Sequence, residues 1–127
     1  MNLKNILYDR IDAKRENGTS VKHVDIGINL ESFNLRKSEL EVNFTYVARY
    51  EPKAGFLILG GTAVFDGKPT DLKKAAVEWK NKKQVTGELG QQLINNLNYS
   101  SSMNAVFVSR VLNMSPPFLI PRLEIKK

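Results

Sequence analysis

Hydrophobic positions at the start of the chain follow a helical spacing. Between Asn2 and Asn17, apolar residues recur every three or four positions with charged residues between them, at Leu3, Ile6, Leu7 and Ile11. Gly18 follows as a helix stop signal. The pattern therefore predicts an amphipathic helical extension over residues 1–18.

From Val21 onward the hydrophobic period changes to two, which is typical of half-buried strands. Apolar and polar residues alternate over Val21–Leu35 and again over Leu40–Glu51. The turn residues Pro52 to Gly55 then predict that a third strand, Phe56–Phe65, folds back antiparallel to the second.

The third predicted strand is unlike the other two because its residues, FLILGGTAVF, carry no charge and are apolar on both faces. A strand of this kind is expected to be covered on both sides. Gly60 and Gly61 lie at its middle and predict a bulge or a close approach of another backbone.

Helical spacing returns in the second half of the chain. Thr70 is a candidate cap for a short helix, whose inward face would be formed by Leu72, Ala75, Ala76 and Trp79. Thr86 is a candidate cap for a long final helix, which Ser100–Ser102 are expected to kink or break. Pro116 and Pro117 end that helix, and Phe118–Ile125 is expected to be extended. These elements predict an α+β fold, in which helices pack on an antiparallel sheet within one domain over residues 1–127.

The long helix contains a stretch without charge. Leu89 to Ser109 is rich in Asn, Gln and Ser but has no charged residue, whereas a helix with one face in water normally carries Lys or Glu. We infer that its own sheet covers one side and a second subunit covers the other; the alternative is a central helix buried within one chain. The candidate interface residues of a homo-oligomer are Leu97, Met103, Asn104 and Val106.

The residue types needed for catalysis are scarce. The chain has no cysteine and one histidine, which excludes thiolate nucleophiles, disulfides, and metal sites built from cysteine or several histidines. His23 lies on the polar face of the first predicted strand, as expected of a surface histidine, and Ser100–Ser102 lack the context of a nucleophile elbow. We therefore expect a protein that is not an enzyme and needs no cofactor or metal.

The net charge of +6 and the pI of about 9.6 make nucleic acid a candidate partner. Much of the surplus lies on the short predicted helix, at Lys73, Lys74, Lys80, Lys82 and Lys83. Stacking sites for bases also need aromatic residues among the charges, and only Trp79 is near, on the inward face. A solvated helix surface is the alternative interpretation of these lysines.

Targeting signals are missing from the sequence. The first residues are charged throughout and lack the apolar core of a secretory signal, and no segment approaches the roughly 20 apolar residues of a membrane span. The sequence therefore predicts a cytoplasmic protein without membrane insertion.

Element order and particular residues resemble the SecB family of export chaperones. The resemblance runs from Val21 to Ile125 and rests on the hairpin ELEVNFTYVARYEPKAGFLILGGTAVFDG and on the helix end MNAVFVSRVLNMSPPFLIPRLEI. Within the second segment, the positions similar to the family pattern are Asn104, Phe107, Arg110, Pro117, Leu119 and Pro121.

This resemblance implies a sheet of about four antiparallel strands, backed by helices and assembled as a dimer of dimers with the long helices between the sheets. It also implies an ATP-independent holdase that binds unfolded polypeptides in apolar grooves. The residues expected to line such grooves are Phe44, Tyr46, Tyr50, Phe56, Ile58, Phe107 and Phe118.

Two features depart from the family pattern. Typical members are acidic and bind the motor SecA through negative charge, so the basic charge of this chain argues against SecA as a partner. The predicted N-terminal helix also has no counterpart in the family. A small basic nucleic-acid-binding domain, using the lysines of residues 68–83, is the alternative function.

Overall fold

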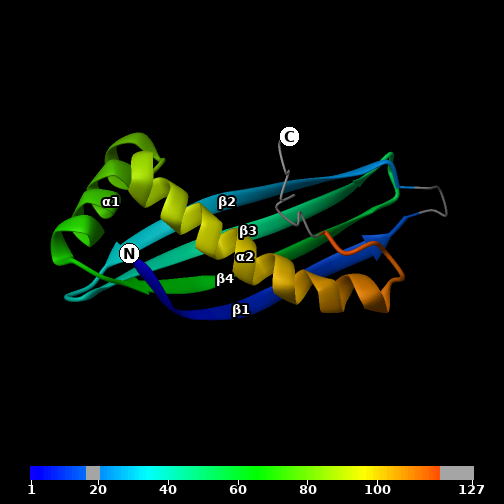
Figure 1. Cartoon of the computed structure of the whole chain (residues 1–127), viewed down its shortest axis with the longest axis horizontal. Coiled ribbons are helices and arrows are strands. Elements are labelled where there is room, and N and C mark those ends of the chain that lie inside the picture. The colour runs from blue at the N-terminus through cyan, green and yellow to red at the C-terminus, as the bar shows by residue number, and fades with distance from the viewer. Residues whose placement is uncertain (17–20, 118–127) are drawn as a thin grey trace, which may run out of the picture.

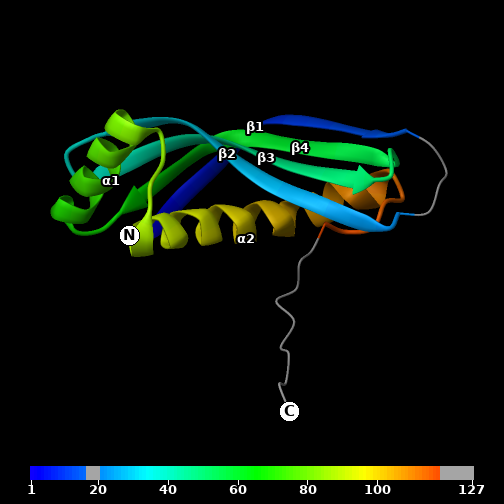
Figure 2. The ribbon, with the colours of Figure 1, turned by 90° about the horizontal axis from the view of Figure 1, so that it is seen from above.

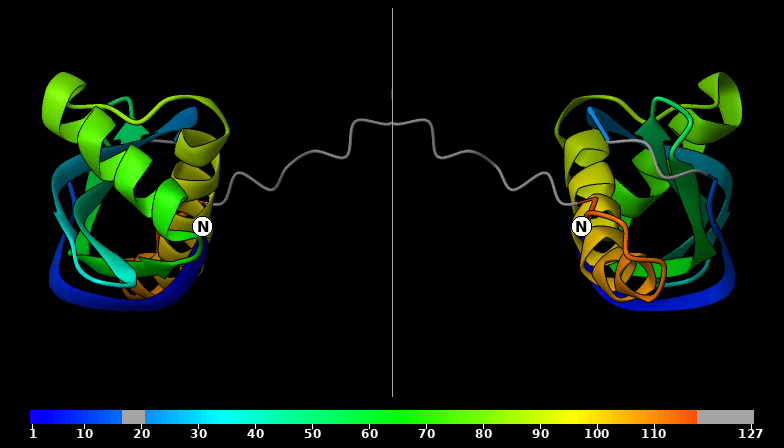
Figure 3. Two further views of the ribbon diagram at one scale, coloured as in Figure 1. Left: turned by 90° about the vertical axis from the view of Figure 1, so that its left-hand side faces the viewer. Right: turned by 90° about the vertical axis from the view of Figure 1, so that its right-hand side faces the viewer.

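A computed structural model describes residues 1–16 and 21–117 of the chain. Four strands precede two helices: β1 (Asn2–Arg15), β2 (His23–Leu35), β3 (Glu39–Glu51), β4 (Gly55–Asp66), α1 (Pro69–Lys82) and α2 (Gly87–Val111) (Figure 1). The strands form one antiparallel sheet in the order β1-β4-β3-β2. Both helices lie on the same face of this curved sheet (Figures 2 and 3). The predicted α+β class is confirmed, with two layers.

The predicted N-terminal helix is wrong, because Asn2–Arg15 forms the edge strand β1, paired with β4. Two bulges interrupt this pairing, between Leu3 and Asn5 and between Tyr8 and Arg10. The first bulge places Leu3 and Ile6 on the same face although they are three residues apart. A bulge in a strand thus gave these apolar residues the three-residue spacing that is typical of a helix.

The central hairpin agrees with the sequence prediction. Strands β3 and β4 pair along their full length, from Glu39 with Asp66 to Tyr50 with Gly55. A Cβ atom on Gly61 would lie 2.2 Å from the carbonyl oxygen of Leu7, so β1 does approach this glycine closely, as predicted. In the described residues, the helices of the chain cover one face of β4; cover on its other face stays a prediction.

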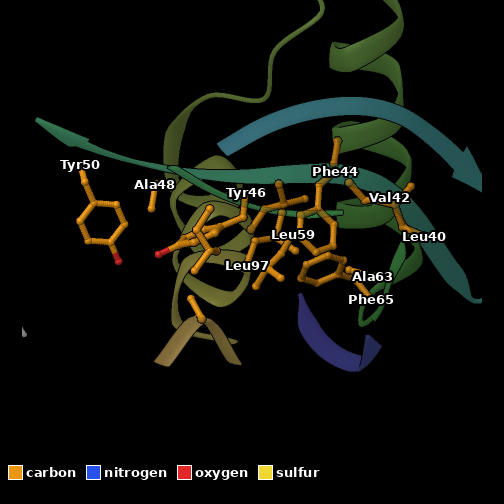
Figure 4. Packing of buried hydrophobic residues seen from close by; sticks show 14 of the residues in the cluster. Leu40, Val42, Phe44, Tyr46, Ala48, Tyr50, Leu59, Ala63, Phe65 and Leu97 are labelled. Carbon is orange, nitrogen blue, oxygen red and sulfur yellow. The ribbon is translucent and has the colours of Figure 1, made fainter. Parts of the chain in front are cut away.

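The core lies between the sheet and the helices (Figure 4). The strand β3 supplies every second residue to it, and all of these side chains are at most 1% exposed: Leu40, Val42, Phe44, Tyr46, Ala48 and Tyr50. From α2 the fully buried side chains include Leu93, Leu97 and Ala105. Alternation in β3 and a spacing of about four in α2 therefore build one core.

The serines of α2 hydrogen-bond to tyrosines of the sheet, and they do not break the helix. The helix is continuous from Gly87 to Val111, so the predicted break does not occur. The hydroxyl of Ser102 lies 3.1 Å from that of Tyr46, and the Tyr8 hydroxyl lies 3.0 Å from that of Ser100 and 3.2 Å from that of Ser101. These hydrogen bonds satisfy polar groups at a largely apolar interface.

The segment that follows α2, residues 112–117, returns along the helix-covered face of the sheet. The Tyr50 hydroxyl donates to the carbonyl oxygen of Ser115 at 2.5 Å, and the Tyr46 hydroxyl donates to that of Pro117 at 3.3 Å. The predicted extended segment Phe118–Ile125 lies outside the described residues.

Candidate polypeptide-binding surfaces

The outer side of α2 carries four large apolar side chains at intervals of four residues. Tyr99 is 68% exposed, Met103 45%, Phe107 69% and Val111 82%. We call these four residues the apolar stripe. Side chains four residues apart are neighbours on a helix surface, so they form one continuous strip. Isolated exposed apolar residues are ordinary, but a contiguous set of this kind is typical of an interaction site.

The predicted interface residues divide between the two sides of this helix. Met103 belongs to the apolar stripe, Asn104 is exposed beside it, and Val106 is half-buried. Leu97 is fully buried against the chain's own sheet, so its assignment to an interface is wrong. Because α2 packs through positions 93, 97, 101 and 105, the outer positions 99, 103 and 107 are the ones left open.

Three of the predicted polypeptide-binding residues are in the core. Phe44, Tyr46 and Tyr50 are at most 1% exposed, so these side chains are not on an open surface of the described chain. Their register places them on the helix-covered face of β3. Burial raises the pKa of the Tyr46 phenol, and it raises that of Tyr50 to about 12.

The three remaining predicted residues that the structure describes fall on accessible surfaces. Phe107 is in the apolar stripe, and Phe118 lies outside the described residues. Phe56 and Ile58 are half-buried on the face of the sheet opposite the helices.

Phe56 and Ile58 share a shallow depression with Val47, which we call the outer hollow. Its volume is about 360 Å³. The charged residues that line it are Asp12, Glu16, Arg49, Glu51 and Lys53. An apolar floor with charges of both signs around it can take an apolar side chain of an extended peptide while neighbouring polar groups stay in water.

A polar band crosses the same face further along the sheet. The Thr62 hydroxyl donates to Oδ1 of Asn43 at 2.7 Å, and Nδ2 of Asn43 donates to the Ser32 hydroxyl at 2.6 Å. The Thr45 hydroxyl donates to Glu31 at 2.7 Å. These hydrogen bonds pair the side chains of the band with one another, and the band separates the outer hollow from the far end of the sheet.

The five predicted nucleic-acid-binding lysines are all exposed on or next to α1. At 100° per residue, Lys73 and Lys80 share one side, whereas Lys74 and Lys82 point elsewhere. Lys83 lies over the ring of Trp79, 5.6 Å from its centroid. The lysines therefore diverge around the helix, and they do not converge on one phosphate-binding surface.

Carboxylates accompany Lys74 and Lys82. A groove of about 680 Å³ between α1 and α2 is lined by these lysines and also by Asp71, Glu78 and Glu88. Hydrogen bonds from Thr86, followed by the charges of Lys82 and Lys74, lower the pKa of Glu78 and keep it ionised. Such mixed charge weakens attraction for a polyanion.

Comparisons with protein families and with curated proteins provide no functional assignment, so a function has to be inferred from the surfaces described above. A scan against protein-family models and a search of curated proteins each found no match to the chain. Within residues 1–16 and 21–117, no group of three or more His, Cys, Asp or Glu is placed to hold a metal ion. The described helices include none that is long and apolar enough to cross a membrane.

Sequence reasoning missed Tyr99, Val111 and Val47. The signal for the first two was present, because residues 99, 103, 107 and 111 are all large and apolar at a constant spacing of four. It was obscured because a second apolar set at 93 and 97 has the same period, and only packing shows which set faces the sheet. Val47 stands at a position of β3 whose neighbours on that face are polar, and it gave no signal.

Proposed function

We propose that this protein is a SecB-like, ATP-independent holdase that assembles as a homo-oligomer and binds unfolded polypeptides on apolar surface. One observation carries the proposal: accessible apolar side chains occur on both layers of the molecule, as the apolar stripe on the helix layer and the outer hollow on the sheet layer. One surface can serve assembly while the other remains open to a client.

The apolar stripe is the surface we assign to assembly. A two-fold axis would bring the same helix of a second copy against it, so that each stripe buries the other. The helix has no charge between Leu89 and Ser109, and such packing would bury no unpaired charge. This arrangement places long helices between sheets, as the resemblance to SecB implies.

The outer hollow is the surface we assign to clients. It lies on the face of the sheet that the helices of the described residues leave open. Val47, Phe56 and Ile58 give an apolar floor, and extended polypeptides present apolar side chains at intervals that such a floor can accept. The surface needs no cofactor or nucleotide to act in this way.

The corrected fold adds support to the resemblance. The N-terminal residues that lacked a counterpart in the family are now a strand, and they complete a sheet of four antiparallel strands followed by a long helix. The basic charge remains a departure, and SecA is not included among the proposed partners.

Suppression of aggregation tests the holding activity. A chemically unfolded substrate is diluted into buffer with and without an equal amount of the protein, and turbidity is followed in the absence of ATP. We expect near-stoichiometric suppression. The double variant Phe56→Ser, Ile58→Ser should lose most of it, whereas Val77→Ser, which changes an exposed residue of α1 away from both surfaces, should retain it.

Light scattering separates assembly from holding. The wild-type protein should have the mass of a dimer or tetramer at micromolar concentration, and Met103→Lys should reduce that mass by placing an unpaired charge in the interface. The outer-hollow double variant should keep the mass of the wild type. A monomeric wild-type protein that still suppresses aggregation would refute the assembly and leave the holding activity.

The lysines of α1 test the alternative function, nucleic-acid binding. If nucleic acid is the true partner, RNA or DNA should bind at physiological salt, and replacing Lys73, Lys74, Lys80 and Lys82 by Gln should flatten the salt dependence by roughly one unit per lost phosphate contact. Binding of that kind, without any effect on aggregation, would replace the chaperone proposal.

A further inference from the structure

Two β-bulges lie at nearly the same level of the sheet, one on each edge strand. The register of pairing shifts at Asp9 in β1 and at Glu31 in β2, and both positions adjoin the row of the sheet that contains Gly61. Bulges redirect side chains and are frequent next to binding sites. Here each bulge adds an exposed residue with a carboxylate to the sheet.

Between the two bulges, the face of the sheet opposite the helices has a hollow of about 300 Å³, which we call the polar pocket. The polar band lies within it, and Thr45 of that band is only 8% exposed. The polar pocket shares no lining residue with the outer hollow. Its polar lining residues come from all four strands and include Asp9 and Arg10 of β1, Thr62 of β4, Asn43 and Thr45 of β3, and Glu31 of β2.

The side chains of the polar band have hydrogen-bonding capacity beyond the bonds that they make to one another. Asn43 donates through Nδ2 to Ser32, and the amide nitrogen carries a second N–H. The hydroxyls of Thr62 and Thr45 each donate one bond, and each oxygen can also accept. A ligand in the polar pocket would therefore meet both donors and acceptors.

The charged side chains of the pocket place a guanidinium between two carboxylates. Asp9 belongs to the edge strand β1, and the stem of Arg10 extends over the neighbouring strand β4, where its Cδ lies 3.7 Å from the position of a Cβ on Gly60. Glu31 reaches in from the opposite edge and accepts a hydrogen bond at 2.7 Å from Thr45 of β3. Within residues 1–16 and 21–117, none of these three charged groups forms an ion pair.

This charge pattern disfavours a ligand of a single charge. A simple anion would meet two carboxylates, and a simple cation would meet the guanidinium. A free basic amino acid carries the complementary set, because it has one carboxylate, one α-ammonium and a second cation on a flexible stem. Asp9 and Thr45 are two strand spacings apart, or about 10 Å, which an extended lysine can bridge through its four-carbon stem.

We propose that the polar pocket binds a free basic amino acid, of which lysine is the simplest fit. Arg10 pairs with the α-carboxylate, for which a planar guanidinium is well shaped, Glu31 accepts from the α-ammonium, and Asp9 accepts from the side-chain ammonium. The inference goes beyond the proposed holding function and does not depend on it. Since all three charged side chains are exposed, each pair contributes little, and we expect a dissociation constant on the order of 1 mM.

The probe is free L-lysine, titrated at near-neutral pH and constant ionic strength into the full chain, which is labelled for amide NMR. We expect saturable amide shifts at Thr45 and at residues 60–62, with much smaller changes at Phe56 and Ile58 of the outer hollow. Nα-Acetyl-L-lysine amide keeps the side-chain cation but lacks both α charges, so it should bind at least about tenfold more weakly. L-Alanine, which lacks the second cation, should bind at least about threefold more weakly than lysine, and L-glutamate at least about tenfold.

Variants of the protein locate the site. Arg10→Gln removes the charge but keeps a long polar side chain, and it should weaken lysine binding by about tenfold. Its matched control is Lys14→Gln, on the same strand and outside the polar pocket, which should change binding less than about twofold. Glu31→Gln should weaken binding by about threefold or more, while its amide oxygen still accepts from Thr45 and keeps the polar band in place. The spectra of these variants should otherwise overlay on that of the wild type, which shows that the fold is kept.

Each alternative gives a distinct result. Equal binding of lysine and its blocked form would mean that the pocket reads only a side chain, as in a polypeptide, and the proposal fails. It also fails if Arg10→Gln and Lys14→Gln weaken binding equally, or if D-glucose produces the same saturable shifts, because net charge or hydroxyl groups would then decide. Lysine binding without any suppression of aggregation keeps this site and removes the holding function. Suppression of aggregation without saturable lysine shifts does the reverse.

Discussion

The two faces of the central hairpin carry similar residues in different environments. Toward the helices, β3 presents Phe44, Tyr46 and Tyr50, which are sealed in the core and whose polar atoms are paired. Toward the other side, β3 and β4 present Val47, Phe56 and Ile58 beside charged residues around an open hollow. Aromatic and aliphatic residues thus stabilise the fold on one face and stay accessible on the other, where we propose that clients bind.

Removal of a core aromatic should give the largest effect. Phe44→Ala deletes a fully buried ring that packs edge-on against Tyr8, and it should lower the free energy of unfolding by about 3 to 5 kcal/mol. Phe56→Ala on the open face should cost much less, because the ring is already partly in water. Urea denaturation of both variants measures the difference, and equal losses would mean that the two faces are not distinct.

Gly60 and Gly61 are adjacent in β4, so substitutions there compare the two faces of the sheet at neighbouring positions. Gly61→Ala would drive a methyl group against the backbone of Leu7 and Tyr8, and we expect a loss near 3 kcal/mol as strands shift apart. Gly60→Ala meets no atom closer than 3.4 Å, so it should be nearly neutral. Thermal unfolding tests this pair. Equal stability of the two variants would contradict the close pairing of β1 with β4.

Ionisation of the buried Tyr50 phenol at high pH should lower the stability that the helix-covered face provides. The pKa of Tyr50 is raised to about 12 in the folded protein from an ordinary value near 10, so its stabilising effect is fully present below about pH 10 and is lost as the pH rises toward about 12. Tyr50→Phe should cost about 1 to 2 kcal/mol at neutral pH, because the Ser115 carbonyl loses its donor.

The same variant provides the control for this pH effect. Because phenylalanine does not ionise, the difference in stability between the wild-type protein and Tyr50→Phe should narrow above pH 10. Denaturation at a series of pH values measures it. A difference that stays constant up to about pH 12 would mean that Tyr50 titrates normally and is not buried.

The polar band of the open face should give the smallest effect. Thr62→Val removes the hydroxyl that donates to Asn43 but keeps the shape of the side chain, and we expect a loss of about 0.5 to 1 kcal/mol. Thr70→Val, at an exposed position that makes no cap hydrogen bond in α1, is the matched control and should be close to neutral. A loss of stability larger than that of Tyr50→Phe would contradict the small contribution that we expect of the polar band.

Much of the fold followed from regular periodicity, and the errors arose where that regularity is broken or ambiguous. The alternation from Leu40 to Tyr50 predicted β3, and the turn at Pro52 predicted its pairing with β4. The bulges of β1 gave Leu3 and Ile6 a helical spacing, which only pairing with a partner strand could reveal as false.

The candidate site could be predicted only in part. Alternation states that Phe44 and Val47 face opposite sides, but it does not say which side the helices cover. The sequence therefore assigns these side chains to the same grooves, whereas in the structure Phe44, Tyr46 and Tyr50 form the core and Phe56 and Ile58 are half-buried on the open face. Likewise, α2 has two apolar sets of equal period, and the choice between Leu97 and Met103 depends on packing.

Calorimetry with a permanently unfolded, chemically reduced and blocked polypeptide tests the holding function most directly. We expect binding with a negative heat-capacity change, because apolar surface is buried, and affinity that changes little between roughly 50 and 300 mM salt. The variant Phe56→Ser, Ile58→Ser should bind about tenfold more weakly, with a loss of stability well below that of Phe44→Ala. Binding that vanishes as salt is added, or an absence of binding to the wild-type protein, would contradict the account.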